Sequence, residues 1–182
     1  MKFKPNESGG VAIELGPKEC QLPMPEGSPD EESVAVFSLK RILVPVDFSD
    51  CSKKALEYAV RFARQFGAEL TLLHVVPRYP PVPEMGPIDV ETLQEGRAQL
   101  EVVRLTIGDL APCGTLLRTG TPHMEIIEAA KEQSIDLIII ATHGHKGLTR
   151  ALLGSTTERV VREAPCPVLV VREKEREFLQ KD

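Results

Sequence analysis

Between residues 39 and 172 the chain alternates short aliphatic segments with longer amphipathic ones. Segments that are apolar almost throughout and rich in β-branched residues are typical of strands buried on both faces. The sequence therefore predicts five buried strands, Arg41–Val46, Leu70–Val76, Thr115–Arg118, Leu137–Ala141 and Val168–Val171.

Apolar residues at helical spacing fill the segments between these strands. Strands that alternate with helices favour parallel pairing and right-handed crossovers. We therefore expect an α/β fold, a doubly wound five-stranded parallel sheet with helices on both faces. The four predicted helices open at Ser49 or Ser52, run through Leu93–Leu110, open at Thr121-Pro122, and open at Ser155 with the capping box Ser155–Glu158.

Ligands of such sheets bind beyond the carboxyl ends of the strands. One carboxylate, Asp47, follows the first strand, and glycines and hydroxyl residues follow the third and fourth. Farther on, Gly154-Ser155-Thr156 stands at a helix start, where unpaired N–H groups and the helix dipole favour an anion. These groups suit a sugar and phosphates.

Simpler structural roles for the same residues stay open. Ser155 can be a plain N-cap and Gly154 a tight turn, and the Asp47 carboxylate can cap the first helix. Neither a P-loop nor Gly-x-Gly-x-x-Gly occurs, which excludes two common classes of nucleotide-binding protein. His74 lies inside an apolar strand, so a buried imidazole with a hydrogen-bond partner is expected there.

Residues 1–38 differ from the rest in composition. They hold three Lys and seven Asp or Glu, a net charge of −4, with five Pro and four Gly. Such a segment buries too little apolar surface to offset the entropy of ordering it. We expect a flexible acidic tail at 1–38, a folded domain at 39–172 and a charged tail at 173–182.

The composition also bears on partners and location. No apolar run approaches the ~20 residues of a membrane span, and no signal-peptide pattern is present. A net charge of −5 and the absence of Trp disfavour nucleic acid. Four widely spaced Cys, without Cys-x-x-Cys, indicate neither disulfides nor a zinc site. We expect a cytoplasmic protein with no membrane or nucleic-acid partner and no bound metal of its own.

Five short segments follow one another in the order Arg41–Ser49, Leu72–Val76, Gly120–Pro122, Thr142–Ser155 and Ala164–Val171. Together they resemble the universal stress protein family over residues 39–172. The family's nucleotide motif is Gly-x2-Gly-x9-Gly followed by Ser or Thr. Gly144, Gly154 and Ser155 match it, whereas Ala141 stands in place of the first glycine.

The resemblance implies a sheet in the order 3-2-1-4-5, a homodimer through the last strand, and bound ATP with Mg²⁺. It implies that Asp47 faces the adenine or ribose and that Val75 lines the adenine slot above Pro45 and Val46. His143 and Gly144 would lie against the sugar and phosphates. Gly154, Ser155 and Thr156 would hold phosphate oxygens, and the Ala141 methyl group would stand beside the ribose.

The function that follows is a cytoplasmic homodimeric ATP-binding module acting in the stress response through protein partners that the sequence does not identify. Paired carboxylates, a nucleophile elbow and a Cys/His arrangement are missing, so we expect no enzyme and assign no catalytic residue. A nucleotide-free dimeric scaffold, suggested by Ala141, and a slow ATP hydrolase stay as alternatives.

Overall fold

The computed structural model describes residues 2–5, 11–14, 38–78, 90–142 and 154–172. The chain divides into two units, Met1–Phe37 and Ser38–Asp182. In the first unit, β1 (Lys2–Pro5) pairs antiparallel with β2 (Val11–Glu14). This pair lies within the segment for which the sequence predicts a flexible tail.

The second unit is built on a five-stranded sheet in which every pair of neighbours is parallel. Its order is β5-β4-β3-β6-β7, which confirms the predicted order 3-2-1-4-5. Two strands are longer than predicted. β4 is longer by one residue at each end than the predicted Leu70–Val76, and β5 is longer by two residues at each end than the predicted Thr115–Arg118 because it includes Gly114 and Gly120. The strands are β3 (Arg41–Pro45), β4 (Glu69–Pro77), β5 (Cys113–Gly120), β6 (Leu137–Ala141) and β7 (Val168–Val171).

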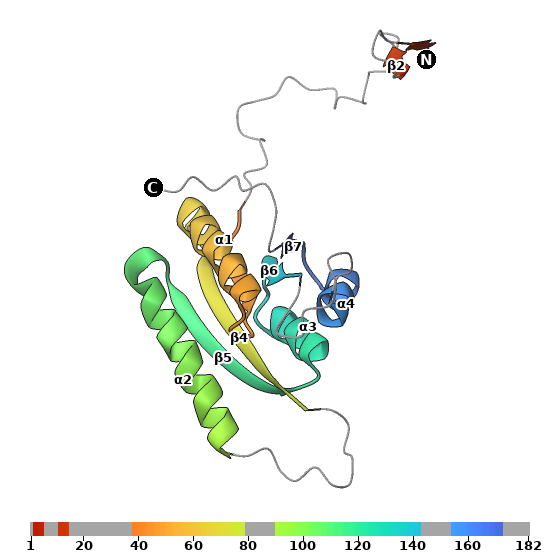
Figure 1. Cartoon of the computed structure of the whole chain (residues 1–182). Helices are drawn as coiled ribbons and strands as arrows, with labels where there is room; N and C mark the ends of the chain where they lie inside the picture. Colours follow the sequence, from red (N-terminus) through yellow and green to blue (C-terminus); the bar gives the residue numbers. More distant parts are fainter. Residues whose placement is uncertain (1, 6–10, 15–37, 79–89, 143–153, 173–182) are drawn as a thin grey trace. The chain divides into compact units, whose positions relative to one another are not determined.

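Helices cover both faces of this sheet, as predicted. Helices α1 and α2 lie on one face and α3 and α4 on the other (Figure 1). A short 3₁₀ turn, η1 (Gly108–Leu110), follows α2. The helices are α1 (Asp50–Phe66), α2 (Val90–Ile107), α3 (Pro122–Glu132) and α4 (Ser155–Glu163).

Successive strand residues feed two separate cores. Ile42 and Val44 of β3 pack beneath α1 and α2, whereas Leu43 between them packs beneath α3 and α4. The same alternation in β6 sends Ile139 to the first core and Ile138 to the second. Burial on both faces explains why these strands are apolar at almost every position.

The predicted start of α1 is confirmed and that of α4 is wrong by one residue. Ser49 is the N-cap of α1, and its side chain accepts a hydrogen bond from Ser52 N. In α4 the N-cap is Gly154 rather than Ser155, so the predicted capping box does not form. Glu158 instead makes an ion pair with Arg162, one turn farther along the helix.

A carboxylate ties the entry of β3 to the entry of β6. Asp136 Oδ2 accepts hydrogen bonds from Lys40 N at 2.9 Å and Arg41 N at 2.8 Å. These two backbone donors lower the pKa of Asp136 below its usual value because they stabilise the charged form. Asp136 therefore stabilises the folded chain only while it is ionised.

We predict that Asp136→Asn lowers the free energy of unfolding at pH 7 by about 1 kcal/mol. This is the contribution of two charge-assisted hydrogen bonds, reduced because the carboxylate is exposed to solvent. The pKa is lower in the folded state, so this contribution is present above the unfolded pKa, about 4, and is lost as pH falls through the folded pKa. Urea denaturation at several pH values tests it. The exposed Asp109→Asn serves as control, and a pH-independent difference would contradict the prediction.

Candidate functional site

The central strands end at different heights at the carboxyl edge of the sheet. β3 ends at Pro45, opposite Leu73, whereas β4 continues to Pro77. Just beyond β3, Val46 N donates to Leu73 O at 2.8 Å. Continuing the β3–β6 register, in which Leu43 pairs with Ile138, places Ala141 level with Val46. The chain segments that leave β3 and β6 therefore start side by side.

The β3–α1 turn carries the only carboxylate predicted for the site. Asp47 Oδ1 accepts hydrogen bonds from Ser49 Oγ at 2.6 Å and Ser49 N at 3.1 Å. Ser49 in turn caps α1. The structural alternative, that Asp47 caps the first helix or interacts with its dipole, is met only in that Asp47 bonds Ser49, because the N-cap itself is Ser49.

Phe48 has an unusual backbone in this turn, with φ at +64°. This left-handed conformation costs a non-glycine residue about 1–2 kcal/mol. The Phe48 ring packs against His74, with centroids 4.5 Å apart. His74 Nδ1 lies 2.8 Å from Val46 O, and because a carbonyl oxygen only accepts, the ring nitrogen is the donor. The predicted imidazole with a partner is confirmed, although the ring is only half-buried.

The start of α4 is fastened to the end of β6 by two hydrogen bonds. Gly154 N donates to Thr142 O at 2.9 Å, and Thr157 Oγ1 donates to Ala141 O at 2.8 Å. Thr142 N in turn donates to Val171 O of β7. The first turn of α4 is thereby held at the carboxyl edge, with Ser155 exposed and Thr156 half-exposed. Its first N–H groups have no earlier helical carbonyl to bond.

The structure brings together most of the predicted site residues. Those at the carboxyl edge come from β3 and the turn after it, β6 and α4, and they are Pro45, Val46, Asp47, Ala141, Gly154, Ser155 and Thr156. Val75 is 9% exposed and packs in the α3–α4 core, whereas Val46 packs in the α1–α2 core. The two side chains therefore lie on opposite faces of the sheet. His143 and Gly144 lie outside the described residues.

The sequence interpretation missed two residues that shape this edge. His74 was assigned only to the core, although a polar side chain in an otherwise apolar strand was a usable signal. Thr157 is 5% exposed and was read only as part of a capping box. Its partner, Ala141 O, is a backbone atom of another element, and nothing in the local sequence identifies such a contact.

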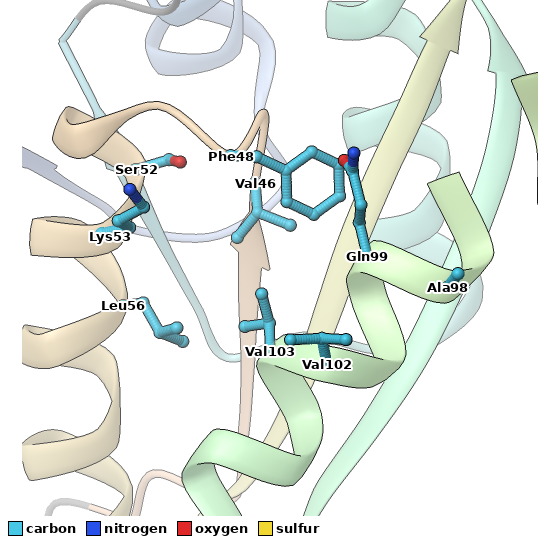
Figure 2. A pocket seen from close by; sticks show the side chains of 9 residues that line it. All are labelled: Val46, Phe48, Ser52, Lys53, Leu56, Ala98, Gln99, Val102 and Val103. Atoms are coloured by element: carbon cyan, nitrogen blue, oxygen red, sulfur yellow. The ribbon is translucent and has the colours of Figure 1, made fainter. Parts of the chain in front are cut away.

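A pocket of about 350 Å³ adjoins the turn on its α1–α2 side. Figure 2 shows the Phe48 ring reaching from the turn toward α2, with Gln99 beside it. Of the predicted nucleotide residues only Val46 lines this pocket, so it is adjacent to the predicted site rather than identical with it. Its walls are Val46, Phe48, Ser52, Lys53, Leu56, Ala98, Gln99, Val102 and Val103.

The described part of the chain offers little for metal binding, thiol chemistry or a membrane span. Within it, no group of three or more His, Cys, Asp or Glu side chains is placed to hold a metal ion. Cys113 and Cys166 are free thiols, and burial raises the pKa of both, that of Cys113 to about 11. Both are therefore protonated at neutral pH. No helix of the described residues is long and apolar enough to span a membrane.

Comparison with known proteins matches this fold to one family. The sequence profile of the universal stress protein family matches residues 38–172. Universal stress protein MJ0531 of Methanocaldococcus jannaschii is 38% identical over 144 residues, which cover 76% of this chain and 85% of that protein. The solved structure of universal stress protein UspA from Lactobacillus plantarum is 34% identical with a TM-score of 0.65, covering 74% of this chain and 99% of that one.

A more distant solved structure holds a nucleotide. It is a universal stress protein in complex with cAMP, 23% identical, with a TM-score of 0.60 over 75% of this chain and 99% of that one. At this identity the likeness establishes a shared fold and no more.

We predict that Thr157→Val lowers the free energy of unfolding by about 1–3 kcal/mol. Valine has nearly the same shape, but it leaves the buried Ala141 carbonyl without its hydroxyl donor. Urea denaturation measures the change. Thr156→Val, one residue earlier and half-exposed, is the matched control and should change stability by less than about 0.5 kcal/mol. Equal effects of the two substitutions would contradict this account of how α4 is held.

Proposed function

The chain belongs to the universal stress protein family, and on that premise we propose that it binds an adenine nucleotide, ATP with Mg²⁺, at the carboxyl edge of β3 and β6. Bound nucleotide changes how the protein meets its partners in the stress response. The protein acts as a cytoplasmic homodimer and as a binding module rather than an enzyme.

The observation that carries this proposal is the position of α4. Gly154 is its N-cap and has no side chain, so nothing of its own covers the N–H groups of the first turn. Those N–H groups and the positive end of the helix dipole attract phosphate. Ser155, which is exposed, and Thr156, which is half-exposed, add hydroxyl donors from the same turn. Mg²⁺ would bridge phosphate oxygens and reduce their charge.

Asp47 supports the nucleoside end of the proposed site. It stands one residue beyond Val46, which is level with Ala141, so it lies on the same edge as the start of α4. Its Oδ1 is oriented by two hydrogen bonds from Ser49. A carboxylate held at this edge is suited to accept hydrogen bonds from ribose hydroxyls or from the adenine amino group.

The burial of Ala141 is an argument against the nucleotide-free alternative. The residue is 7% exposed and belongs to the α1–α2 core cluster, so its methyl group is packed inside the protein. Its carbonyl oxygen accepts from Thr157. One universal stress protein of this fold has been solved in complex with cAMP, which is an adenine nucleotide.

Calorimetric titration with ATP and Mg²⁺ tests the proposal. We expect wild-type binding at micromolar affinity, about −8 kcal/mol. Gly154→Val places a branched side chain over the first turn of α4 and should abolish it. The matched control is Gly114→Val in β5, where an added Cβ meets nothing within 4 Å and where valine suits a strand.

Three outcomes would change the assignment. No binding by the wild-type chain would contradict the nucleotide proposal and favour the dimeric scaffold. Binding followed by steady release of phosphate, lost in Gly154→Val, would favour the slow ATP hydrolase. If the Gly154→Val and Gly114→Val variants bind ATP equally well, α4 is not part of the binding site.

The last strand supports the proposed dimer. β7 is an edge of the sheet, and Val168, Leu169 and Val170 are only half-buried although all are apolar. Ile138 N donates to Pro167 O and Thr142 N to Val171 O. In a parallel ladder this alternation directs the backbone of Leu169 and Val171 toward β6 and that of Val168 and Val170 outward. An apolar edge with outward N–H groups is suited to pairing with a second copy.

We predict that Val170→Pro converts the dimer into a monomer, because proline removes an outward N–H group without breaking the ladder to β6. Light scattering after size exclusion measures the mass. Leu169→Pro is the contrasting variant, since it breaks the ladder and should lower the unfolding temperature. A Val170→Pro protein that stays dimeric would exclude pairing through β7.

A further inference from the structure

One imidazole holds the chain on both sides of Asp47. His74 Nδ1 donates to the carbonyl of Val46, the residue before Asp47, at 2.8 Å. The ring of the same histidine packs against Phe48, the residue after it, at a centroid distance of 4.5 Å. Val46 N is also bonded to Leu73 O, so the turn is fastened to two consecutive residues of β4.

The backbone of Phe48 needs this support. Its φ of +64° is unfavourable for a residue with a Cβ, and glycine is the usual choice there. Such a conformation persists only where surrounding contacts compensate for its cost. The ring contact with His74 is one, and the phenyl group also lines the pocket between α1 and α2 (Figure 2).

Helix α2 leaves room for this histidine. Gly96 is buried in the middle of α2, where glycine weakens a helix by about 1 kcal/mol relative to alanine. A Cβ at Gly96 would come within 3.2 Å of His74 Cδ2 and within 3.2 Å of Leu117 Cδ1. The absence of a side chain lets the helix backbone approach the imidazole closely, so the ring has little freedom to turn.

We infer that His74 is a positioning residue of the nucleotide site. By bonding Val46 and packing against Phe48, a pair of contacts that we call the His74 grip, it fixes the position of the Asp47 carboxylate. The inference rests on the proposed function for its link to the nucleotide. Loss of the grip lets Phe48 leave the left-handed region and lets the Ser49-bonded carboxylate shift with it. Nucleotide affinity falls while the two cores stay packed.

Three substitutions separate the hydrogen bond from the ring. His74→Asn keeps an N–H donor at the same number of bonds from Cα as Nδ1 and removes the ring. His74→Phe keeps an aromatic ring and removes the donor, and His74→Ala removes both. Thr71→Ala is the matched control, since it deletes a side-chain hydrogen bond, 3.0 Å to Gln133 Oε1, from the same strand.

Two readouts are measured on each full-length variant at a temperature where all are folded. Hydrogen exchange of the peptide covering residues 46–53 reports the turn without any nucleotide, because Val46, Ser49, Ser52 and Lys53 each have a bonded N–H there. Calorimetric titration with ATP and Mg²⁺ reports affinity. We expect faster exchange and about tenfold weaker binding in His74→Phe, the factor for one lost hydrogen bond. His74→Ala should be weaker still.

His74→Asn should restore exchange and affinity to within about threefold of wild type, a smaller change than loss of the whole hydrogen bond. Thr71→Ala should leave both near wild type even where it lowers stability. Unchanged exchange in His74→Ala would overturn the grip itself, and faster exchange with unchanged affinity would overturn its link to the site. Failure of the wild-type chain to bind any nucleotide would instead overturn the proposed function, while exchange still judges the grip.

Discussion

Parallel pairing of β3 with both β4 and β6 is the constraint on which the remaining structure depends. It places the carboxyl ends of all the strands at one edge of the sheet, so the segments after β3 and β6 lie close together although they are far apart in the sequence. It also requires helices on both faces, which buries successive residues of each strand in different cores. The polar atoms at the edge are therefore held by rigid elements on either side.

The strands that form this edge have unequal lengths. β4 continues past the end of β3, so on that side His74 lies beside the β3–α1 turn, whereas on the other side the last residues of β4 pair with β5. His74 uses this position to bond the carbonyl of Val46, which the β-ladder no longer satisfies. On the other side of β3, α4 supplies Thr157 to the carbonyl of Ala141. The carbonyl groups of Val46 and Ala141, at the ends of β3 and β6, are thus each bonded by a side chain from a neighbouring element.

The fold was predictable because its signals are local and repeated. Five apolar segments and the helical spacing between them were enough for a parallel sheet with two helix layers, whereas the strand order followed from the resemblance to the universal stress protein family. The start of α4 was not, because Gly154 N–H bonds to Thr142 O and places the N-cap one residue earlier than the Ser155–Glu158 pattern indicates. The left-handed Phe48 was also unforeseeable, since its support comes from a residue in the next strand, and the imidazole contact that frames the turn spans 28 positions.

Ala141 illustrates why a motif position has to be judged by what its atoms do. The family motif has glycine there, and the resemblance predicts that the added methyl group stands beside the ribose. In the fold, residue 141 lies opposite Val171 in the β6–β7 register, its carbonyl oxygen accepts a hydrogen bond from Thr157, and its side chain is buried with the α1–α2 core. Alanine performs each of these roles as glycine would, and it restricts the backbone more. The substitution is therefore compatible with an intact edge, and the groups that we propose to face the nucleotide are those of the turn after β3 and the first turn of α4.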